Sequence, residues 1–241
     1  MSNYKNPQIL VELQDCMGDD QAIADAAWTS SYDKDRREAK YDEPERIKHL
    51  IENVLLGHDV AHNVPFESVV LRFWIRHPIF SDRQHQTHRL QSSSGLSGRY
   101  RTMPLDYFEV PPEVEEIFKR ANQEGKYIPL GYLYKKSCDK ATQNYKITID
   151  CLKEAQQMGY INNSEYKRAR EIARGQLPTA GMVERTFLMN LSAFANYQLK
   201  RNSEHAQPEI KQVAEMMLHE VESKGVAPIA VAALKKRGWK L

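Results

Sequence analysis

The clearest alternation of apolar and polar residues lies in FESVVLRFWIR, residues 66–76. Two sets of side chains alternate along this segment: the apolar Val69, Leu71, Phe73 and Ile75, and the polar Ser68, Arg72 and Arg76. Because successive side chains of a strand point to opposite faces, the pattern predicts a strand over 66–76 with one buried face. A second strand is expected over QILVELQD, residues 8–15, and a shorter one near 105–110.

Elsewhere the apolar residues recur at helical spacing. Pro44 suits the first turn of a helix, and an apolar stripe follows it, formed by Ile47, Leu50, Ile51, Val54 and Leu55. Further helices are expected over 18–28, 112–123, 136–158, 163–175, 190–202, 208–225 and 227–234, with a short one opening at Pro78. Since neither a repeat nor a linker interrupts the chain, we expect one domain over residues 1–241, an α+β fold with many helices and a small sheet.

Composition narrows the classes of function. The chain carries 34 basic and 32 acidic side chains, a formal charge of +2, whereas nucleic-acid binders usually carry a strong basic excess. Its longest apolar run, residues 227–234, falls well short of the roughly 20 residues of a membrane span. The cysteines at 16, 138 and 151 match neither a disulfide framework nor a zinc pattern. We therefore expect a cytoplasmic protein that holds no metal and binds neither nucleic acid nor membrane.

A polar stretch, THRLQSSSGLSGRYR, spans residues 87–101. Such a stretch is either a solvated loop or a site for an anion. The Ser97-Gly98-Arg99 turn favours the second interpretation, because a hydroxyl, a free backbone N–H and a guanidinium suit one phosphate. A second arginine from a distant segment would complete the clamp.

This stretch resembles the signature of the flavin-dependent thymidylate synthases (ThyX), R-H-R-x-x-S-x-N-x-x-S-x-R-Y. The matching positions are His88, Arg89, Ser92, Ser97, Arg99 and Tyr100. Flanking matches follow in the same order along the chain: MGDD (17–20), PFES (65–68), HPIFSDRQ (77–84), REIARGQLP (170–178), Asn190, Asn196 and R-x-x-x-H-A-Q (201–207). The resemblance therefore covers most of the chain, from about Val11 to Ala214.

The resemblance implies a helix-rich fold around a small, mainly antiparallel sheet. It implies the reductive methylation of dUMP to dTMP, with dUMP or a related pyrimidine deoxynucleotide as the bound partner. FAD, NADPH and 5,10-methylenetetrahydrofolate would be the cofactors, and no cysteine would act as nucleophile. A homotetramer whose active sites are shared between chains would be the assembly.

The resemblance also assigns roles to residues. Arg201 is expected to be catalytic, because it matches the arginine that polarises the pyrimidine ring. The nucleotide would be bound by Gln84, Ser97, Gly98, Arg99, Arg174 and Arg201, with Arg174 supplied by another protomer. The flavin and folate would be contacted by His62, Glu67, His88, Arg89, Asn190, Asn196 and His205. For His205, a structural hydrogen bond at a helix start remains an equal alternative.

Four positions depart from the family pattern. Thr87 stands where the motif has its first arginine, and Ser94 where it has asparagine; Gly95 replaces a common glutamate, and Ser192 a flavin-side arginine. One hypothesis is that Arg83, one helical turn earlier, replaces the guanidinium lost at Thr87. Two alternatives to thymidylate synthesis stay open: methylation or hydroxymethylation of another nucleotide such as dCMP, and a catalytically inactive protein that binds nucleotide or flavin.

Overall fold

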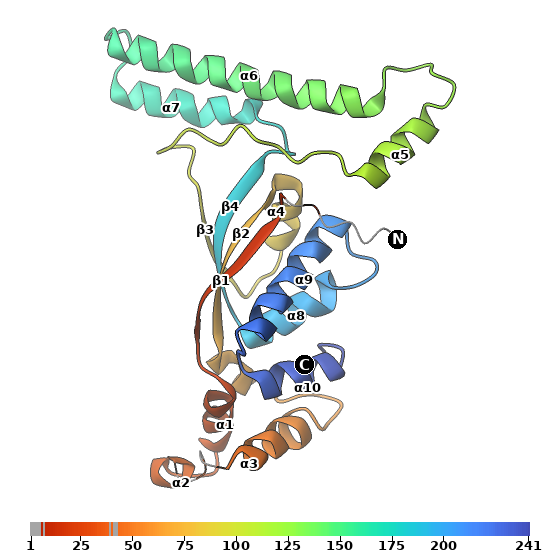
Figure 1. The fold of residues 1–241 in the computed structure, drawn as a ribbon. Coiled ribbons are helices and arrows are strands. Elements are labelled where there is room, and N and C mark those ends of the chain that lie inside the picture. The colour runs from red at the N-terminus through yellow and green to blue at the C-terminus, as the bar shows by residue number, and fades with distance from the viewer. Residues whose placement is uncertain (1–5, 7, 39, 41–42) are drawn as a thin grey trace. The chain divides into compact units, whose positions relative to one another are not determined.

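The structure is a computed structural model of the chain and describes all residues except 1–5, 7, 39 and 41–42. More than half of the chain is helical, and four antiparallel strands form one sheet in the order β1-β2-β4-β3 (Figure 1). The strands are β1 (Leu10–Met17), β2 (Val70–Pro78), β3 (Ser92–Gly95) and β4 (Met182–Asn190). The predicted α+β class, rich in helices around a small antiparallel sheet, is therefore confirmed.

The α-helices are α1 (Asp20–Trp28), α2 (Lys34–Glu38), α3 (Pro44–His49), α4 (Ile79–His85), α5 (Pro112–Ala121), α6 (Leu130–Gln157), α7 (Asn163–Ala173), α8 (Leu191–Arg201), α9 (Pro208–Ser223) and α10 (Pro228–Lys236). Short helices of other types are η1 (Leu50–Leu55, a π-helix) and the 3-10 helices η2 (Val64–Ser68) and η3 (Arg174–Gln176). Among the residues that the structure describes, no helix is both long enough and apolar enough to cross a membrane.

The chain divides into two compact units, each built from three separate segments. The α8 unit comprises residues 10–75, 84–94 and 185–241, and the α6 unit comprises residues 1–9, 76–83 and 95–184. Each unit is described by itself. A single domain over residues 1–241 remains a prediction.

The core of the α8 unit forms around the predicted apolar row of β2. Val69, Leu71, Phe73 and Ile75 are completely buried, as their alternation predicts. The Phe73 ring stacks on that of Phe194 in α8, with 6.1 Å between the ring centres. In the same unit α9 packs along β1 and beside α8 (Figure 1).

The α6 unit is organised by two neighbouring helices, α6 and α7 (Figure 1). Tyr145, Ile149 and Ala173 form a buried cluster between them, and Met103 and Leu177 pack against it. The Tyr145 hydroxyl accepts a hydrogen bond from the Met103 backbone N–H at 3.0 Å. This contact ties the loop that follows residue 99 to the helices.

The element bounds correct several predictions. The β2 strand begins at Val70 instead of Phe66, because η2 occupies Val64–Ser68 and its Pro65 fixes a φ that suits a helix turn. It also continues to Pro78, so the short helix α4 begins one residue later than predicted. The strand predicted near 105–110 is wrong: only an isolated bridge joins Tyr107 to Gly181.

Helix predictions fared better than strand predictions. The helices α1, α5, α7, α8, α9 and α10 begin within two residues of their predicted starts. The long helix α6 begins at Leu130, six residues before the predicted start, and the helix from Pro44 continues as the π-helix η1. Strands β3 and β4 were not predicted at all.

Candidate active site

The first candidate cluster lies in the α8 unit and centres on Arg201, the last residue of α8. Its Nε donates to His88 Nε2 at 2.9 Å, and its Nη2 donates to the Gln84 carbonyl oxygen and to Thr87 Oγ1, each at 3.0 Å. A longer contact of 3.5 Å joins Nη1 to Gln84 Oε1. All these acceptors are uncharged when the histidine is neutral, so the guanidinium is oriented without a carboxylate among these contacts. We call Gln84, Thr87, His88 and Arg201 the Arg201 cluster.

Local hydrogen bonds at the end of α4 and at the start of α8 fix the segments that carry the Arg201 cluster. Gln84 lies in the last turn of α4, and Thr87 Oγ1 donates back to the Gln84 carbonyl oxygen at 2.7 Å. Asn190 begins α8 by accepting a hydrogen bond from the Ala193 N–H at 2.8 Å, a helix cap typical of asparagine. The two segments of the cluster, 113 to 117 residues apart in sequence, are thereby brought together.

His88 is held in its neutral form. Burial, followed by the positive charges of Arg201 and Lys200, lowers its pKa from 6.5 to about 4. Because Nε2 accepts a hydrogen bond from Arg201 Nε, the ring proton belongs on Nδ1. The imidazole thus adds no second positive charge beside Arg201.

An aromatic layer supports His88. Its ring lies 4.7 Å from that of Tyr197, whose hydroxyl contacts His85 Nδ1 at 3.0 Å. The His85 ring stacks in turn on Phe187 of β4, at 3.8 Å between centres. Burial raises the pKa of the Tyr197 hydroxyl, so this residue stays protonated. The sequence analysis missed this layer, although Tyr197 lies in the predicted α8 helix.

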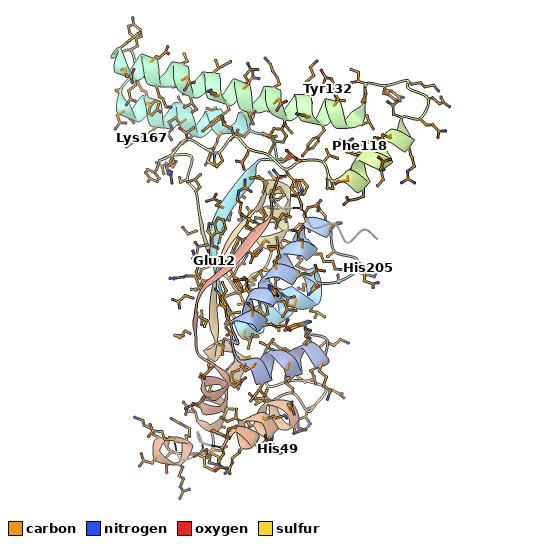
Figure 2. All side chains as sticks on the ribbon, in the orientation of Figure 1. Glu12, His49, Phe118, Tyr132, Lys167 and His205 are labelled. Atoms are coloured by element: carbon orange, nitrogen blue, oxygen red, sulfur yellow. The ribbon has the colours of Figure 1, made fainter. Side chains whose placement is uncertain are left out.

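The remaining predicted residues of the α8 unit lie on several elements. His62 lies in the loop before η2, Glu67 lies in η2, and Arg89 follows His88; all three are exposed. Asn196 is exposed on α8, and His205 is exposed in the connection from α8 to α9, where Figure 2 labels it. No hydrogen bond of the described structure links these five side chains to the Arg201 cluster. Their expected contacts with flavin and folate stay predictions.

The second candidate cluster lies in the α6 unit and contains the Ser97-Gly98-Arg99 turn. Gly98 is buried, and a Cβ atom placed on it would lie 3.2 Å from Arg174 Cδ. Arg174, in η3, therefore lies beside this turn in the same chain; its expected contact with the nucleotide of another protomer stays a prediction. The Arg99 N–H donates to Ser97 Oγ at 3.3 Å. We call Ser97, Gly98, Arg99 and Arg174 the anion clamp.

A carboxylate that the sequence analysis did not assign meets the clamp. Glu171 Oε1 lies 2.6 Å from Arg99 Nε, and Glu171 Oε2 accepts from Arg168 Nη1 at 3.0 Å. The hydrogen bond from Arg168, and then the charges of Arg99, Arg168 and Arg174, lower the pKa of Glu171. The only signal in the sequence is its position in REIARGQLP, three residues from Arg168 and from Arg174.

The structure thus groups the predicted nucleotide residues into two sets. Gln84 and Arg201 meet in the Arg201 cluster together with His88, and the other four form the anion clamp. The replacement of the guanidinium lost at Thr87 by that of Arg83 stays a prediction. The structure shows another consequence of that departure, since the Thr87 hydroxyl itself binds Arg201.

Comparison with known proteins places these residues in a family. A family model described as thymidylate synthase complementing protein matches residues 12–229. The flavin-dependent thymidylate synthase of Thermosipho africanus is 32% identical over 204 residues, which cover 85% of this chain and 82% of the relative. The enzyme of the same name from Treponema pallidum is 30% identical over 226 residues, 93% of this chain and 68% of the relative.

The solved structures agree on the fold. A crystal structure of a UMP/dUMP methylase, PolB from Streptomyces cacaoi, bound with 5-Br dUMP, superposes with a TM-score of 0.72. It covers 96% of both chains at 24% sequence identity. Residues 12–229, which the family model matches, contain all members of the Arg201 cluster and the anion clamp. On these grounds the chain belongs to the thymidylate synthase complementing protein family, whose relatives include the flavin-dependent thymidylate synthases.

Proposed function

We propose that this protein is a flavin-dependent thymidylate synthase, which methylates dUMP to dTMP with methylenetetrahydrofolate as carbon donor and NADPH as reductant. The observation that carries the proposal is the Arg201 cluster. It joins two motif segments distant in sequence around one guanidinium that neutral acceptors hold. Family membership and the names of the relatives support the same conclusion.

In this proposal Arg201 acts on the pyrimidine ring. A fixed cation beside a carbonyl oxygen stabilises negative charge as it develops on the ring, and an oriented guanidinium does so without reorganising during the reaction. His88 contributes by staying neutral, so that its Nε2 fixes the guanidinium while the ring adds no charge. Thr87 and Gln84 fix the other side of the guanidinium.

The anion clamp is assigned to the phosphate of the nucleotide. Arginine suits a phosphate because its planar fork donates to two oxygens in parallel. The glycine at 98 allows the Arg174 stem to lie close to the turn, where any side chain would press on it.

The flavin would be FAD, and when bound it supplies the redox chemistry of the reaction. The donor set of the α8 unit fits such a group, because the exposed Arg89, His62 and Asn196 can donate N–H bonds to a pyrophosphate and to ring carbonyls. Glu67 and His205 are proposed to bind near the flavin and the folate, and Asn190 to combine flavin contact with its capping role.

We extend the proposal to assembly and location. Large apolar side chains are exposed on α6, among them Tyr132 (56%), Leu133 (45%) and Ile147 (58%). Such side chains are available to an interface with another copy of the chain, and we propose the homotetramer with shared active sites that the resemblance implies. A chain with free cysteines suits the cytoplasm.

The test is turnover by purified protein supplied with FAD, NADPH and methylenetetrahydrofolate, with dUMP or dCMP as substrate. We expect dUMP to gain one methyl group, as measured by mass spectrometry of the nucleotides, and dCMP to be unchanged. A hydroxymethyl product, or reaction with dCMP alone, would show that the departures at Thr87, Ser94, Gly95 and Ser192 redirect the reaction. Bound nucleotide without any product would favour the inactive binding protein.

A further inference from the structure

Within this chain the anion clamp meets an anionic side chain, the carboxylate of Glu171. Its Oε1 lies 2.6 Å from Arg99 Nε, a distance typical of a charge-assisted contact. Arg99 is the more exposed partner, since its side chain is 60% exposed whereas that of Glu171 is 20% exposed. The carboxylate lies on α7, and the guanidinium reaches it from the loop that contains Arg99.

Glu171 is surrounded by positive charge. Arg168 precedes it by three residues and binds Oε2 at 3.0 Å, and Arg174 follows it by three residues on the next turn. The positive charges of three arginines, Arg99, Arg168 and Arg174, thus act on one carboxylate in the described part of the α6 unit. Three guanidinium groups and one carboxylate leave a net positive charge, which can attract a further anion. The carboxylate makes this attraction weaker than that of the arginines alone.

We propose that Glu171 is a built-in competitor for the phosphate of the substrate. It holds Arg99 in place before the nucleotide arrives, and the phosphate has to displace it from the guanidinium. The residue thereby weakens phosphate binding and speeds release of a phosphorylated product. This inference rests on the proposed function only in naming a nucleotide as the source of the phosphate; the chemistry of the site requires only a phosphate group.

Competition for one guanidinium has a defined consequence. In the Glu171→Gln variant the amide accepts a weaker hydrogen bond and carries no charge, so Arg99 is available to the ligand. We expect dUMP and inorganic phosphate each to bind about two- to fivefold more tightly. This factor corresponds to the free energy of one solvent-exposed ion pair. Deoxyuridine, which lacks the phosphate, should bind as it does to the unaltered protein.

The matched control is Glu116→Gln, which removes the same charge from an exposed pair with Lys119 elsewhere in the α6 unit. It should leave all three affinities unchanged, which separates the local competition from a change in net charge. Circular dichroism and the thermal midpoint of each variant establish that the fold is retained.

The affinities are measured by isothermal titration with dUMP, inorganic phosphate and deoxyuridine, at low and high salt. Weaker binding of phosphate to Glu171→Gln would overturn the proposal, because Glu171 would then position Arg99 for the ligand. Equal binding by both proteins would overturn it too. If the unaltered protein binds phosphate but not dUMP, the proposed function fails while the competition remains measurable with phosphate alone.

Discussion

Two arginines of this protein are held in opposite ways. Arg201 donates to an imidazole, a carbonyl oxygen and a hydroxyl, all uncharged, whereas Arg99 contacts the carboxylate of Glu171. A cation held by neutral acceptors keeps its full field for a reacting group, while a cation paired with a carboxylate presents little net charge until the pair opens. The difference indicates that Arg201 is held ready to stabilise charge on a reacting group. Arg99, in contrast, is suited to exchange the Glu171 carboxylate for a bound anion.

The largest effect should come from removing the prepared cation. We expect Arg201→Ala to lower kcat by about 10²- to 10³-fold, the usual cost of losing a group that stabilises charge in the transition state. Steady-state kinetics with dUMP measure it, and Lys200→Ala, which removes the neighbouring exposed cation, should have little effect. A variant that changed KM alone would mean that Arg201 only binds the substrate.

The Thr87 hydroxyl sharpens the comparison, because it is the acceptor that this chain has in place of the family arginine. Thr87→Val keeps the shape and removes the acceptor of the Arg201 Nη2 bond. We expect kcat to fall by about two- to tenfold, the worth of one hydrogen bond, and Thr87→Ser to restore it. Unchanged kcat in Thr87→Val would show that the hydroxyl does not position the guanidinium.

The smallest effect concerns the protonation of His88. Its pKa in the folded protein, about 4, lies below its ordinary value of 6.5, so folding favours the neutral ring. The resulting stabilisation is complete above about pH 6.5 and is lost as the pH falls toward about 4, where a protonated ring faces Arg201. Thermal midpoints across this range should therefore fall more in the unaltered protein than in His88→Gln. Parallel curves would contradict the role given to His88.

Sequence alone predicted elements whose signal is local. The buried row of β2 follows from strict alternation, and α8 and α9 follow from helical spacing with Asn190 and Pro208 at their starts. The β4 strand was missed because MVERTFLMN mixes apolar residues on both sides, and its pattern of burial depends on neighbours distant in sequence. The 3-10 turn at Phe66 was missed because the residues after Pro65 fit a strand equally well by composition.

The residues of the candidate site were likewise predicted only in part from the sequence. The family resemblance predicted Arg201, Gln84 and His88 as site residues. Only the fold shows that Arg201 also binds Thr87, 114 residues earlier in the chain. Glu171 lies on a predicted helix, where a solvated carboxylate is the ordinary expectation. Its contact with Arg99 depends on how a loop meets α7, and no spacing in the sequence encodes that meeting.

The most direct test of the contrast compares the binding of dUMP and deoxyuridine to the unaltered protein, Arg99→Ala and Arg201→Ala. If Arg99 serves the phosphate, Arg99→Ala should weaken dUMP binding by about tenfold and leave deoxyuridine binding unchanged. Arg201→Ala should affect the two ligands by equal factors, because both carry the same ring. Equal losses for both ligands in Arg99→Ala, or a loss confined to dUMP in Arg201→Ala, would contradict the division of roles between the two arginines.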